Sequence, residues 1–408
     1  MISNLKIGLF GFGCVGQGLY DVLSKSSGIK ADIVKICVKD RTKKRKLPME
    51  YFTYSKNDIL YNPEINLVVE LIDDADEAFN IVKTAMSEGK SVVTANKKMV
   101  ANHLAELVEL QHKYNVSLLY EASSCGSIPI IRTLEEYYDN ELLYSVSGIF
   151  NGSSNYILSK IFNENLDYAT ALKQAQDLGF AESNPLLDVG GFDPKYKLTI
   201  IAAHAYGLFI HPDDILNLGI QNLSLADIEY ARKNGKKIKL VNTVRKLNDD
   251  EITIHTLPTF VAPQQYLYFV ENEFNGVIVE AAFSDKQFYL GKGAGGHPTG
   301  SAVLSDISAV TYDYKYAYHK SLQDKKVKYS KDVLLEVYVR YSNAEELNLV
   351  AFESISEKGT DFVIGTVKLE KLLNNLSALQ NSTLFIANTG KNVMQSSSEE
   401  KTAEKALN

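Results

Sequence analysis

The chain has 408 residues, 45% of them hydrophobic, and a formal net charge of −7, which is the composition of an ordinary globular protein with two or three domains. This acidic balance argues against a general nucleic-acid-binding protein, and no apolar run is long enough to span a membrane. Three scattered cysteines, seven histidines without metal-ligand spacing and no evident signal peptide predict a reduced, cytoplasmic protein without a zinc site.

Strands and helices alternate over the first part of the chain. Short apolar runs predict strands at 5–10, 33–38, 67–72, 91–94 and 117–120. Helical spacing of apolar residues predicts helices at 17–23, 76–89 and 99–114. Strands that alternate with helices in this way favour a parallel, doubly wound α/β sheet.

A glycine-rich turn connects the first strand to the first helix, with the sequence Gly11-Phe12-Gly13-Cys14-Val15-Gly16. The first glycine allows a tight turn, the second lets the backbone approach a pyrophosphate, and the third lets the helix pack on the strand. The N-terminus of the helix adds N–H groups and a positive dipole end for the phosphates. We therefore predict a dinucleotide-binding domain over residues 1–130, with a ligand-free glycine turn as the alternative.

The residues after the second strand bear on the choice of cofactor. An acidic residue there usually holds the ribose 2′-hydroxyl of NAD, and Asp40 is in that place. Lys39 and Arg41 flank it and could instead pair with the 2′-phosphate of NADP. Cations are more numerous here, which favours NADP over NAD, although residues 43–46 also suit a solvated loop.

From about residue 130 the pattern changes. Helices are predicted at 129–138, 154–163, 167–178 and 194–209, and strands at 144–150, 251–261 and 266–290. This mixture suits an α+β substrate domain over residues 131–325. Glycines at 291–296 open a helix that runs to about 312, and we expect residues 293–315 to pack back onto the first domain.

The last part of the chain predicts a small separate unit. The lysine-rich residues 326–332 suit a linker, and an α+β unit follows over 333–390. Its predicted elements are strands at 333–341, 349–356 and 362–369, a helix at 370–380 and a strand at 384–387. The polar and charged residues 394–408 predict a disordered tail.

The segment from Gly179 to Lys197 holds the residues best suited to chemistry, namely Glu182, Asp188, Asp193, Lys195 and Lys197. It predicts a polar pocket for a small zwitterion, because an ammonium group needs carboxylates and a developing alkoxide needs a cation or an acid. Taken alone, Asp193 before Pro194 also fits a helix N-cap, with Lys197 an ordinary first-turn residue. Glu182 taken alone fits a solvated surface acid.

The order and spacing of several motifs make the chain resemble the homoserine dehydrogenase family from residue 5 to about 315. Besides the glycine turn and the segment from Gly179 to Lys197, these motifs are Val93-Thr94-Ala95-Asn96-Lys97, Tyr120-Glu121-Ala122, Ile128-Pro129-Ile130-Ile131, Gly148 to Leu158, and Gly293-Ala294-Gly295 with Pro298-Thr299. The resemblance implies a Rossmann-type domain followed by an α+β catalytic and dimerisation domain. It also implies NAD(P)H-dependent interconversion of L-aspartate 4-semialdehyde and L-homoserine, on the route to threonine and methionine.

The resemblance implies roles for individual residues. Lys197 would donate the proton during reduction, with Asp193 as its polar partner, and Lys97 would lie between nicotinamide and substrate. Glu182 would bind the substrate ammonium, and Asp188 and Ser153 would also face the substrate. The residues expected on the cofactor side are Gly11, Phe12, Gly13, Cys14, Val15, Gly16, Lys39, Arg41, Lys97, Gly179, Gly293 and Gly295.

Three further expectations come from the resemblance. The protein would be a homodimer, and the unit at 333–390 would be an ACT-like domain of ferredoxin-like topology that lacks its usual first helix. A monovalent cation such as sodium would bind Glu121 and the main-chain carbonyls of Ser124, Gly126 and Ile128.

The chain departs from the family pattern at Asp73-Asp74, where many relatives carry two glycines, so cofactor contacts there are in question. Two alternatives to a homoserine dehydrogenase remain open. One is an inactive, cofactor-sensing relative, against which the intact set of acidic residues and lysines argues. The other is a dehydrogenase of another short amino or oxo acid.

Overall fold

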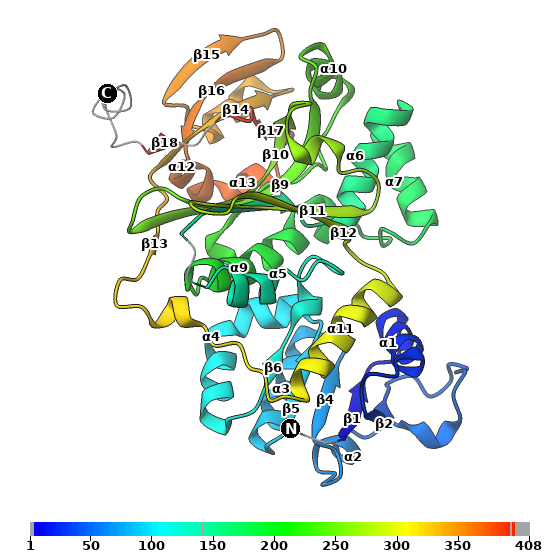
Figure 1. Ribbon diagram of the computed structural model, residues 1–408. Helices are drawn as coiled ribbons and strands as arrows, with labels where there is room; N and C mark the ends of the chain where they lie inside the picture. Colours follow the sequence, from blue (N-terminus) through cyan, green and yellow to red (C-terminus); the bar gives the residue numbers. More distant parts are fainter. Residues whose placement is uncertain (1–3, 140–141, 392–393, 396–408) are drawn as a thin grey trace. The chain divides into compact units, whose positions relative to one another are not determined.

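The computed structural model describes residues 4–139, 142–391 and 394–395. The chain divides into two compact units, drawn with their elements in Figure 1. Unit 1 comprises residues 1–140, 199–209 and 291–322, and unit 2 comprises residues 141–198, 210–290 and 323–408. The chain therefore passes between the units several times. The placement of 291–322 in unit 1 agrees with the predicted return of residues 293–315 to the first domain, whereas the return of 199–209 was not predicted.

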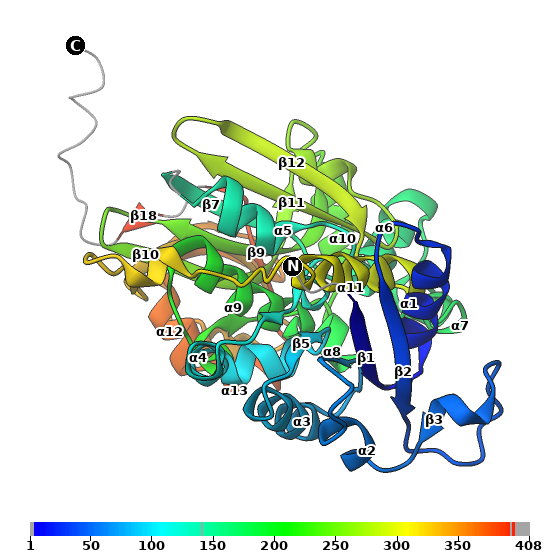
Figure 2. The same cartoon turned by 60° about the horizontal axis from the view of Figure 1, so that its bottom comes forward.

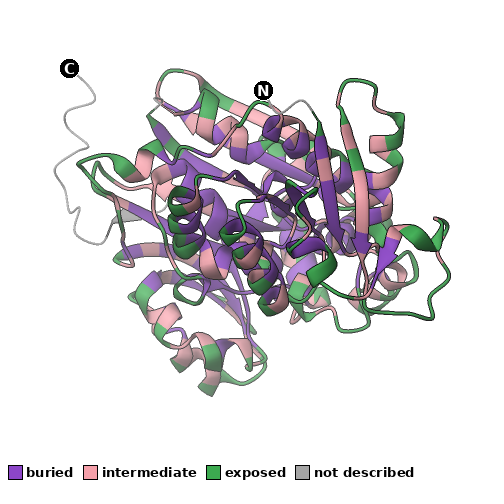
Figure 3. Ribbon diagram, turned by 90° about the horizontal axis from the view of Figure 1, so that it is seen from below, coloured by how far each residue is buried: buried purple, intermediate pink, exposed green. Residues whose placement is uncertain are grey.

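Unit 1 is built on a six-stranded parallel sheet with the order β3-β2-β1-β4-β5-β6, which is the order of a doubly wound dinucleotide-binding fold. The strands β1, β4 and β5 are almost continuously buried, as expected for parallel strands covered on both faces (Figure 3). The predicted doubly wound sheet is confirmed. Its strands are β1 (Leu5–Phe10), β2 (Ala31–Cys37), β3 (Phe52–Thr53), β4 (Leu67–Glu70), β5 (Ser91–Thr94) and β6 (Leu118–Leu119).

Helices cover this sheet, and Figure 1 shows α3 and α4 side by side. Asp74 and Asn96 cap α3 and α4, since their side chains accept hydrogen bonds from the Glu77 and Met99 N–H groups. The helix predicted at 129–138 ends early and continues as a π-helical turn, in which the Tyr138 N–H bonds to the Thr133 carbonyl. The helical segments are α1 (Cys14–Lys25), α2 (Asn57–Leu60), α3 (Ala75–Ser87), α4 (Lys97–Tyr114), α5 (Ile130–Arg132), the turn η3 (Thr133–Tyr137) and α11 (Gly296–Val310).

Two helices of unit 1 that are distant in sequence, α1 and α11, meet through glycines. A Cβ atom at Gly18 would lie 2.0 Å from the carbonyl oxygen of Gly296. A Cβ atom at Gly300 would lie 2.6 Å from the backbone nitrogen of Leu19. The helix that follows the late glycine cluster is thus part of the same unit as the glycine turn.

Unit 2 is built on a twelve-stranded, largely antiparallel sheet whose main path is β12-β11-β7-β9-β10-β17-β14-β16-β15. Figure 2 shows β11 and β12 side by side, and β12 is the edge strand. The strand predicted at 266–290 is therefore a hairpin. The strands are β7 (Leu143–Ile149), β9 (Lys237–Lys246), β10 (Glu251–Val261), β11 (Phe274–Ala281), β12 (Asp285–Lys292), β14 (Val333–Arg340), β15 (Ser354–Lys358), β16 (Phe362–Lys368) and β17 (Phe385–Asn388), with the short β8 (Leu216–Asn217), β13 (Lys328–Tyr329) and β18 (Met394–Gln395).

The described helices of unit 2 include four that the sequence predicts, one of them split in two, and two, α8 and α10, that it does not. The predicted helix at 194–209 is α9, which starts in unit 2 and ends among residues of unit 1. The helix predicted at 370–380 is broken at Asn375. The helices are α6 (Gly152–Glu164), α7 (Tyr168–Asp177), α8 (Leu186–Val189), α9 (Phe192–Tyr206), α10 (Leu225–Lys233), α12 (Leu369–Asn374) and α13 (Leu376–Gln380).

The C-terminal residues form part of the large sheet instead of a separate unit. Their strands lie in the order β17-β14-β16-β15, and β17 pairs with β10 at Thr259 and Asn388. A 3-10 turn, η7 (Ala344–Leu349), stands where a ferredoxin-like fold has its first helix. The order of strands and helices fits a degenerate ferredoxin-like unit, while an ACT domain stays a prediction.

Two boundaries predicted near this region are wrong. The lysine-rich linker at 326–332 contains β13, which pairs with β10. Met394 and Gln395, placed by the sequence in a disordered tail, form β18 against β14. The predicted tail at 396–408 lies outside the described residues.

The core of unit 2 explains why the C-terminal strands join it. One apolar cluster brings Tyr338, Ile364 and Phe385 of these strands together with Ile157 of α6 and Ile238 of β9. Within the described residues, no helix has the length and apolar character needed to cross a membrane.

Candidate active site

The glycine turn of unit 1 has the geometry that a dinucleotide needs. Gly11 has φ +88°, and a Cβ atom there would lie 2.5 Å from the Leu71 carbonyl oxygen. A Cβ atom at Gly13 would meet open space, and one at Gly16 would lie 2.6 Å from the Gly11 carbonyl oxygen. The turn therefore lies between the ends of β1 and β4, where the strand order reverses, and leaves room for a pyrophosphate at Gly13. These residues fit a nicotinamide cofactor.

The late glycines of unit 1 lie beside this turn. A Cβ atom at Gly296 would lie 2.8 Å from the Cys14 carbonyl oxygen. Gly295, with φ +120°, precedes α11, and Gly293 packs against Gly126 of the loop after β6. The N-termini of α1 and α11 thus converge, so both helix dipoles present their positive ends to the phosphate region.

The predicted 2′-phosphate residues lie in an exposed loop after β2. The Asp40 carboxylate accepts hydrogen bonds from the N–H and hydroxyl of Thr42, both at 2.7 Å, which lower the pKa of Asp40. The guanidinium of Arg41 lies 4.7 Å from the ring centre of Tyr54, and the Lys39 ammonium lies 3.8 Å from Asp74. The acidic residue is therefore engaged within its own turn, and Lys39 and Arg41 stand exposed on either side.

Polar residues at the ends of β4 and β5 hold the segment that begins α4. The buried Glu70 carboxylate accepts hydrogen bonds from the Ile72 N–H at 2.6 Å and the Thr94 hydroxyl at 2.5 Å, while burial raises the pKa of Glu70 to about 7. The Asn96 amide donates to the Ile72 carbonyl at 3.1 Å. These contacts fix the strand ends directly before Lys97, the first residue of α4.

The buried Glu121 carboxylate of unit 1 accepts main-chain hydrogen bonds and lies 3.9 Å from the Arg132 guanidinium. Its two oxygens accept hydrogen bonds from the Ile131 and Arg132 N–H groups, both at 2.8 Å. Burial raises the pKa of Glu121 to about 7. The Ile128 carbonyl accepts a hydrogen bond from the Ile130 N–H at 2.8 Å. Each Glu121 oxygen accepts one N–H and keeps a further lone pair, so the cation site of Glu121, Ser124, Gly126 and Ile128 stays a prediction.

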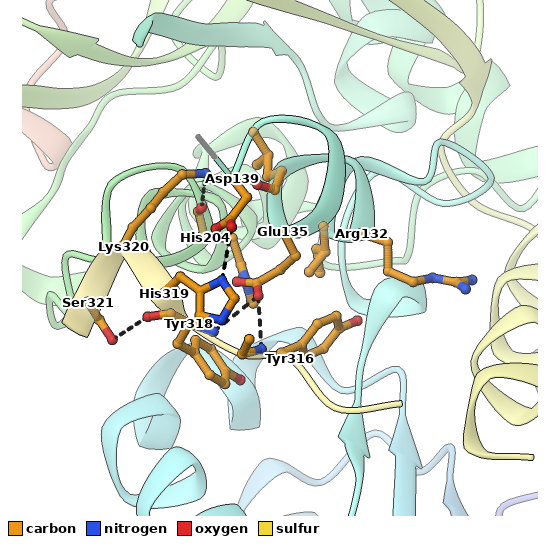
Figure 4. A network of polar contacts seen from close by, with 12 residues as sticks. Arg132, Glu135, Asp139, His204, Tyr316, Tyr318, His319, Lys320 and Ser321 are labelled. Carbon is orange, nitrogen blue, oxygen red and sulfur yellow. Dashed lines mark hydrogen bonds and ion pairs between the residues drawn. The ribbon is translucent and has the colours of Figure 1, made fainter. Parts of the chain in front are cut away.

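A second buried network in unit 1 centres on Glu135 and His204 (Figure 4). The Glu135 carboxylate pairs with His204 Nδ1 at 2.6 Å and accepts the Ala317 and Tyr318 N–H groups at 3.1 Å. His204 Nε2 lies 2.8 Å from the Tyr120 hydroxyl. Burial acts to raise the pKa of Glu135, but the charge and hydrogen bond of His204 bring it below the ordinary value.

Lys320 is a further member of the same network. Its ammonium donates hydrogen bonds to the carbonyls of Leu134 and His204 at 2.8 and 3.0 Å, and burial lowers the pKa of Lys320 to about 8. Because the Tyr120 and His204 side chains are buried, this network binds the segment 316–320 to the rest of unit 1 and is not a surface for ligands.

The acid-rich segment of unit 2 forms a buried cluster at the start of α9. The Lys197 ammonium lies 2.9 Å from Asp193 Oδ2 and donates to the Phe150 carbonyl at 2.6 Å. The Asn151 amide nitrogen donates to Asp193 Oδ2 at 2.9 Å and to Asp188 Oδ1 at 2.7 Å. The structure thus brings Asp188, Asp193 and Lys197 together. α9 begins at Phe192, so Asp193 lies inside its first turn and does not serve as a simple N-cap.

The remaining predicted residues of unit 2 lie around this cluster. Ser153, in the first turn of α6, donates its hydroxyl hydrogen bond to the Phe180 carbonyl. Gly179, with φ +76°, follows the end of α7, so its left-handed conformation ends that helix. The Glu182 carboxylate is exposed and, within the described residues, makes no hydrogen bond or ion pair, so nothing joins it to Asp188 or Asp193.

Several residues that shape these sites were not predicted from the sequence. Asn151 and Asn275 are buried, and Asn275 donates to the same Phe150 carbonyl at 3.1 Å. Glu70 and Asn96 hold the strand ends of unit 1. Glu70 and Asn151 each stand at the end of an apolar run. This position is the one sequence signal that could have identified these two residues.

Comparison with known proteins agrees with these observations. Family models described as "Homoserine dehydrogenase, NAD binding domain" and "Homoserine dehydrogenase" match residues 11–121 and 129–308. The homoserine dehydrogenase of Bacillus subtilis is 32% identical over 379 residues, which is 88% of this chain and 87% of that protein. That of Helicobacter pylori is 37% identical over 75% of this chain and 74% of its own length. The crystal structure of a homoserine dehydrogenase from Thiobacillus denitrificans superposes with a TM-score of 0.80 at 29% identity, covering 95% of this chain and 98% of that one.

Proposed function

The chain belongs to the homoserine dehydrogenase family, which interconverts L-homoserine and L-aspartate 4-semialdehyde with a nicotinamide cofactor, and we propose that Lys197 and Asp193 act at the reacting oxygen. The observation that carries this proposal is the buried pair of Lys197 and Asp193, 2.9 Å apart, beside the Asp188 carboxylate. A buried ammonium within a group of carboxylates supplies both a charge and a proton.

The proposed step follows from the needs of aldehyde reduction. The cofactor, when bound, supplies the hydride to the aldehyde carbon. The aldehyde oxygen then gains charge, and Lys197 Nζ gives it a proton, which leaves the hydroxyl of homoserine and a neutral lysine that regains its proton from water. Asp193, 2.9 Å from Lys197 Nζ, orients the ammonium for the transfer. In the oxidative direction the same lysine, as the neutral amine, accepts the hydroxyl proton.

The acidic residues are proposed to bind the amino-acid end of the substrate. Asp188 is supported by its place in the cluster, 2.7 Å from the Asn151 amide. Glu182 is proposed for the substrate ammonium on the resemblance alone, and its exposed position leaves it free to reach a ligand. Ser153 and Lys97 are proposed as further substrate contacts.

We propose that the cofactor is NADP. The support is the loop after β2, where Asp40 is engaged in its own turn while Lys39 and Arg41 are exposed. The Thr42 bonds occupy only Oδ1 of Asp40, so the support for NADP is the pair of exposed cations, which suit a 2′-phosphate. The proposed contacts for the rest of the cofactor are residues 11–16, Gly293 and Gly295. Gly179 is proposed as a further cofactor contact on the resemblance alone.

A monovalent cation, a homodimer and a cytoplasmic location complete the proposal. The proposed cation ligands are Glu121 and the main-chain carbonyls of Ser124, Gly126 and Ile128. The three cysteines, all within the described residues, are free thiols, which suits a reducing compartment.

The test is an activity assay with matched lysine variants. Lys197→Met keeps the length of the side chain and removes the ammonium, and Lys173→Met does the same to an exposed lysine that pairs with Asp177 on α7. We expect kcat for oxidation of homoserine by NADP to fall at least about 1000-fold in Lys197→Met, since a general acid–base residue is worth on the order of 100- to 10,000-fold. Lys173→Met should keep parental kcat.

Asp193→Asn completes this experiment, because it removes the charge beside the ammonium and keeps the shape. We expect a fall of about 100-fold in kcat with a smaller change in KM. Parental kcat in both Lys197→Met and Asp193→Asn would remove the proposed roles.

A further inference from the structure

We infer that Asn151 is the positioning residue of the site, because its single amide group holds both the Asp188 and the Asp193 carboxylates in place. This inference rests on the proposed roles of Asp193 and Lys197. It assigns to Asn151 a task separate from helix capping, namely to keep two neighbouring carboxylates ionised beside one lysine.

The contacts of the Asn151 side chain are divided between its two ends. The oxygen accepts the Ser154 N–H at 2.8 Å, which caps α6. The nitrogen donates one hydrogen to Asp188 Oδ1 at 2.7 Å and one to Asp193 Oδ2 at 2.9 Å. The side chain is buried, so these bonds are shielded from water. Every hydrogen-bonding group of the amide has a partner, and its orientation is fixed by the cap.

Charge explains why an amide is required at this position. Asp188 Oδ1 and Asp193 Oδ2 share one donor nitrogen, so the two carboxylates are close, and like charges at close range oppose each other's ionisation. A donor placed between them offsets this repulsion. Asp193 Oδ2 is also the atom that faces Lys197, so the amide sets the oxygen against which the ammonium rests.

The backbone around Asn151 is held by other buried amides, which supports a site built for precise placement. Asn275 donates to the Phe150 carbonyl at 3.1 Å, and Asn242 donates to the Gly148 carbonyl at 3.1 Å. Asn217 donates to the Gly190 carbonyl at 3.0 Å, just before α9. Both segments that carry the cluster, 148–151 and 190–193, are therefore anchored to the sheet of unit 2.

The two ends of the amide can be tested separately, because Asp and Ser are also good N-cap residues. Asn151→Asp keeps the shape and the cap but replaces the donor with a third carboxylate. Asn151→Ser keeps the cap acceptor but has one hydrogen and cannot bridge both carboxylates. Asp167→Asn is the matched control, since Asp167 caps α7 in the same unit through the Thr170 N–H at 2.9 Å and is exposed.

The expected result is a loss of activity much larger than any loss of folded protein can explain. We expect kcat/KM for homoserine to fall about 100-fold in Asn151→Ser, as charged hydrogen bonds are lost, and about 1000-fold in Asn151→Asp. Both variants keep the cap, but each loses donated bonds to buried carboxylates, so we expect the melting temperature to fall by several degrees while the protein stays folded at the assay temperature. Asp167→Asn should keep both parental activity and parental melting temperature.

The pH profile provides the readout that a merely structural role would not move. Without the amide the carboxylates bind protons more readily, so the acid limb of the kcat/KM profile should move upward by about one pH unit in Asn151→Ser. Asp167→Asn should leave the profile in place. The parental profile and parental kcat/KM in Asn151→Ser would overturn the inference, and so would a loss of activity that follows only a loss of folded protein.

Failure of this inference is distinguishable from failure of the proposed function. If Lys197→Met and Asp193→Asn lose activity while Asn151→Ser keeps it, only the role of Asn151 is wrong. If all three keep parental activity, the proposed roles of Asp193 and Lys197 fail first.

Discussion

Removal of the Glu135 carboxylate should destabilise unit 1 more than any exposed acidic residue does. In Glu135→Ala, His204 Nδ1 and the Ala317 and Tyr318 N–H groups lose the acceptors that now lie at 2.6, 3.1 and 3.1 Å. Removing one partner of a buried pair costs about 3–5 kcal/mol, because the other partner stays buried and unpaired. For a unit of this size such a loss corresponds to a fall in melting temperature on the order of 10 °C.

Glu135→Gln separates shape from charge. The amide oxygen can still accept the Ala317 and Tyr318 N–H groups, and the amide nitrogen can donate to His204 Nδ1 if the ring changes tautomer. We therefore expect a loss of only about 1–2 kcal/mol. Because the pKa of Glu135 is below its ordinary value of 4.5, the stability that its charge contributes is present above about pH 4.5 and is lost as the pH falls further. The difference between parent and Glu135→Gln should accordingly shrink below pH 4.5.

The assay is thermal unfolding followed by circular dichroism at pH 7 and at pH 4, with Glu109→Ala as the control. Glu109 is an exposed residue of α4, and its replacement should change stability by less than about 0.5 kcal/mol. If Glu135→Ala melts within about 2 °C of the parent, the network of Figure 4 contributes little and the reasoning is refuted.

Three other predictions follow from single positions. Gly18→Ala places a Cβ atom 2.0 Å from the Gly296 carbonyl oxygen and should lower the free energy of unfolding, measured in urea, by at least about 3 kcal/mol. Gly28 has open space around it, so Gly28→Ala should change the free energy of unfolding by less than about 1 kcal/mol. Burial, aided by the charge of a nearby arginine, lowers the pKa of His255 from 6.5 to about 4, so stability should fall by up to about 3 kcal/mol as the pH drops from 6.5 to 4. Urea titrations of the parent and His255→Gln over that range check this, and equal slopes would contradict it. Arg41→Ala should raise the KM for NADPH about tenfold and leave the KM for NADH unchanged, because only NADPH loses a phosphate contact. An equal rise in both KM values would argue against an NADP site.

The parts of the fold that the sequence predicted are those with a local cause. The glycine turn at Gly11 and the apolar run of β5 depend on neighbouring residues, and their positions agree with the structure. β9 was missed because its lysines interrupt the apolar pattern. Lys239 is nevertheless buried, since its ammonium donates to Asn155 Oδ1 and to the Val270 carbonyl.

The C-terminal strands show a second limit of local patterns. β17 joins β10 through the pairing of Thr259 and Asn388, residues far apart in the chain, and no local pattern carries that information. The same applies to the site. The spacing of Asp193 and Lys197 on one helix was visible in the sequence, whereas the amide of Asn151 that bridges Asp188 and Asp193 depends on how α6 and α9 pack.

The continuity of the large sheet has a consequence for how this enzyme can be shortened. A truncation before Val333 would remove β14, β16 and β17, and with β17 the pairing of Asn388 with Thr259 of β10. It would also remove Tyr338, Ile364 and Phe385 from a cluster that includes Ile157 of the helix behind Asn151. The C-terminal strands therefore belong to the core of unit 2. We expect a protein shortened before Val333 to expose the rest of this apolar cluster and to aggregate, whereas removal of an independent domain would leave the remainder folded.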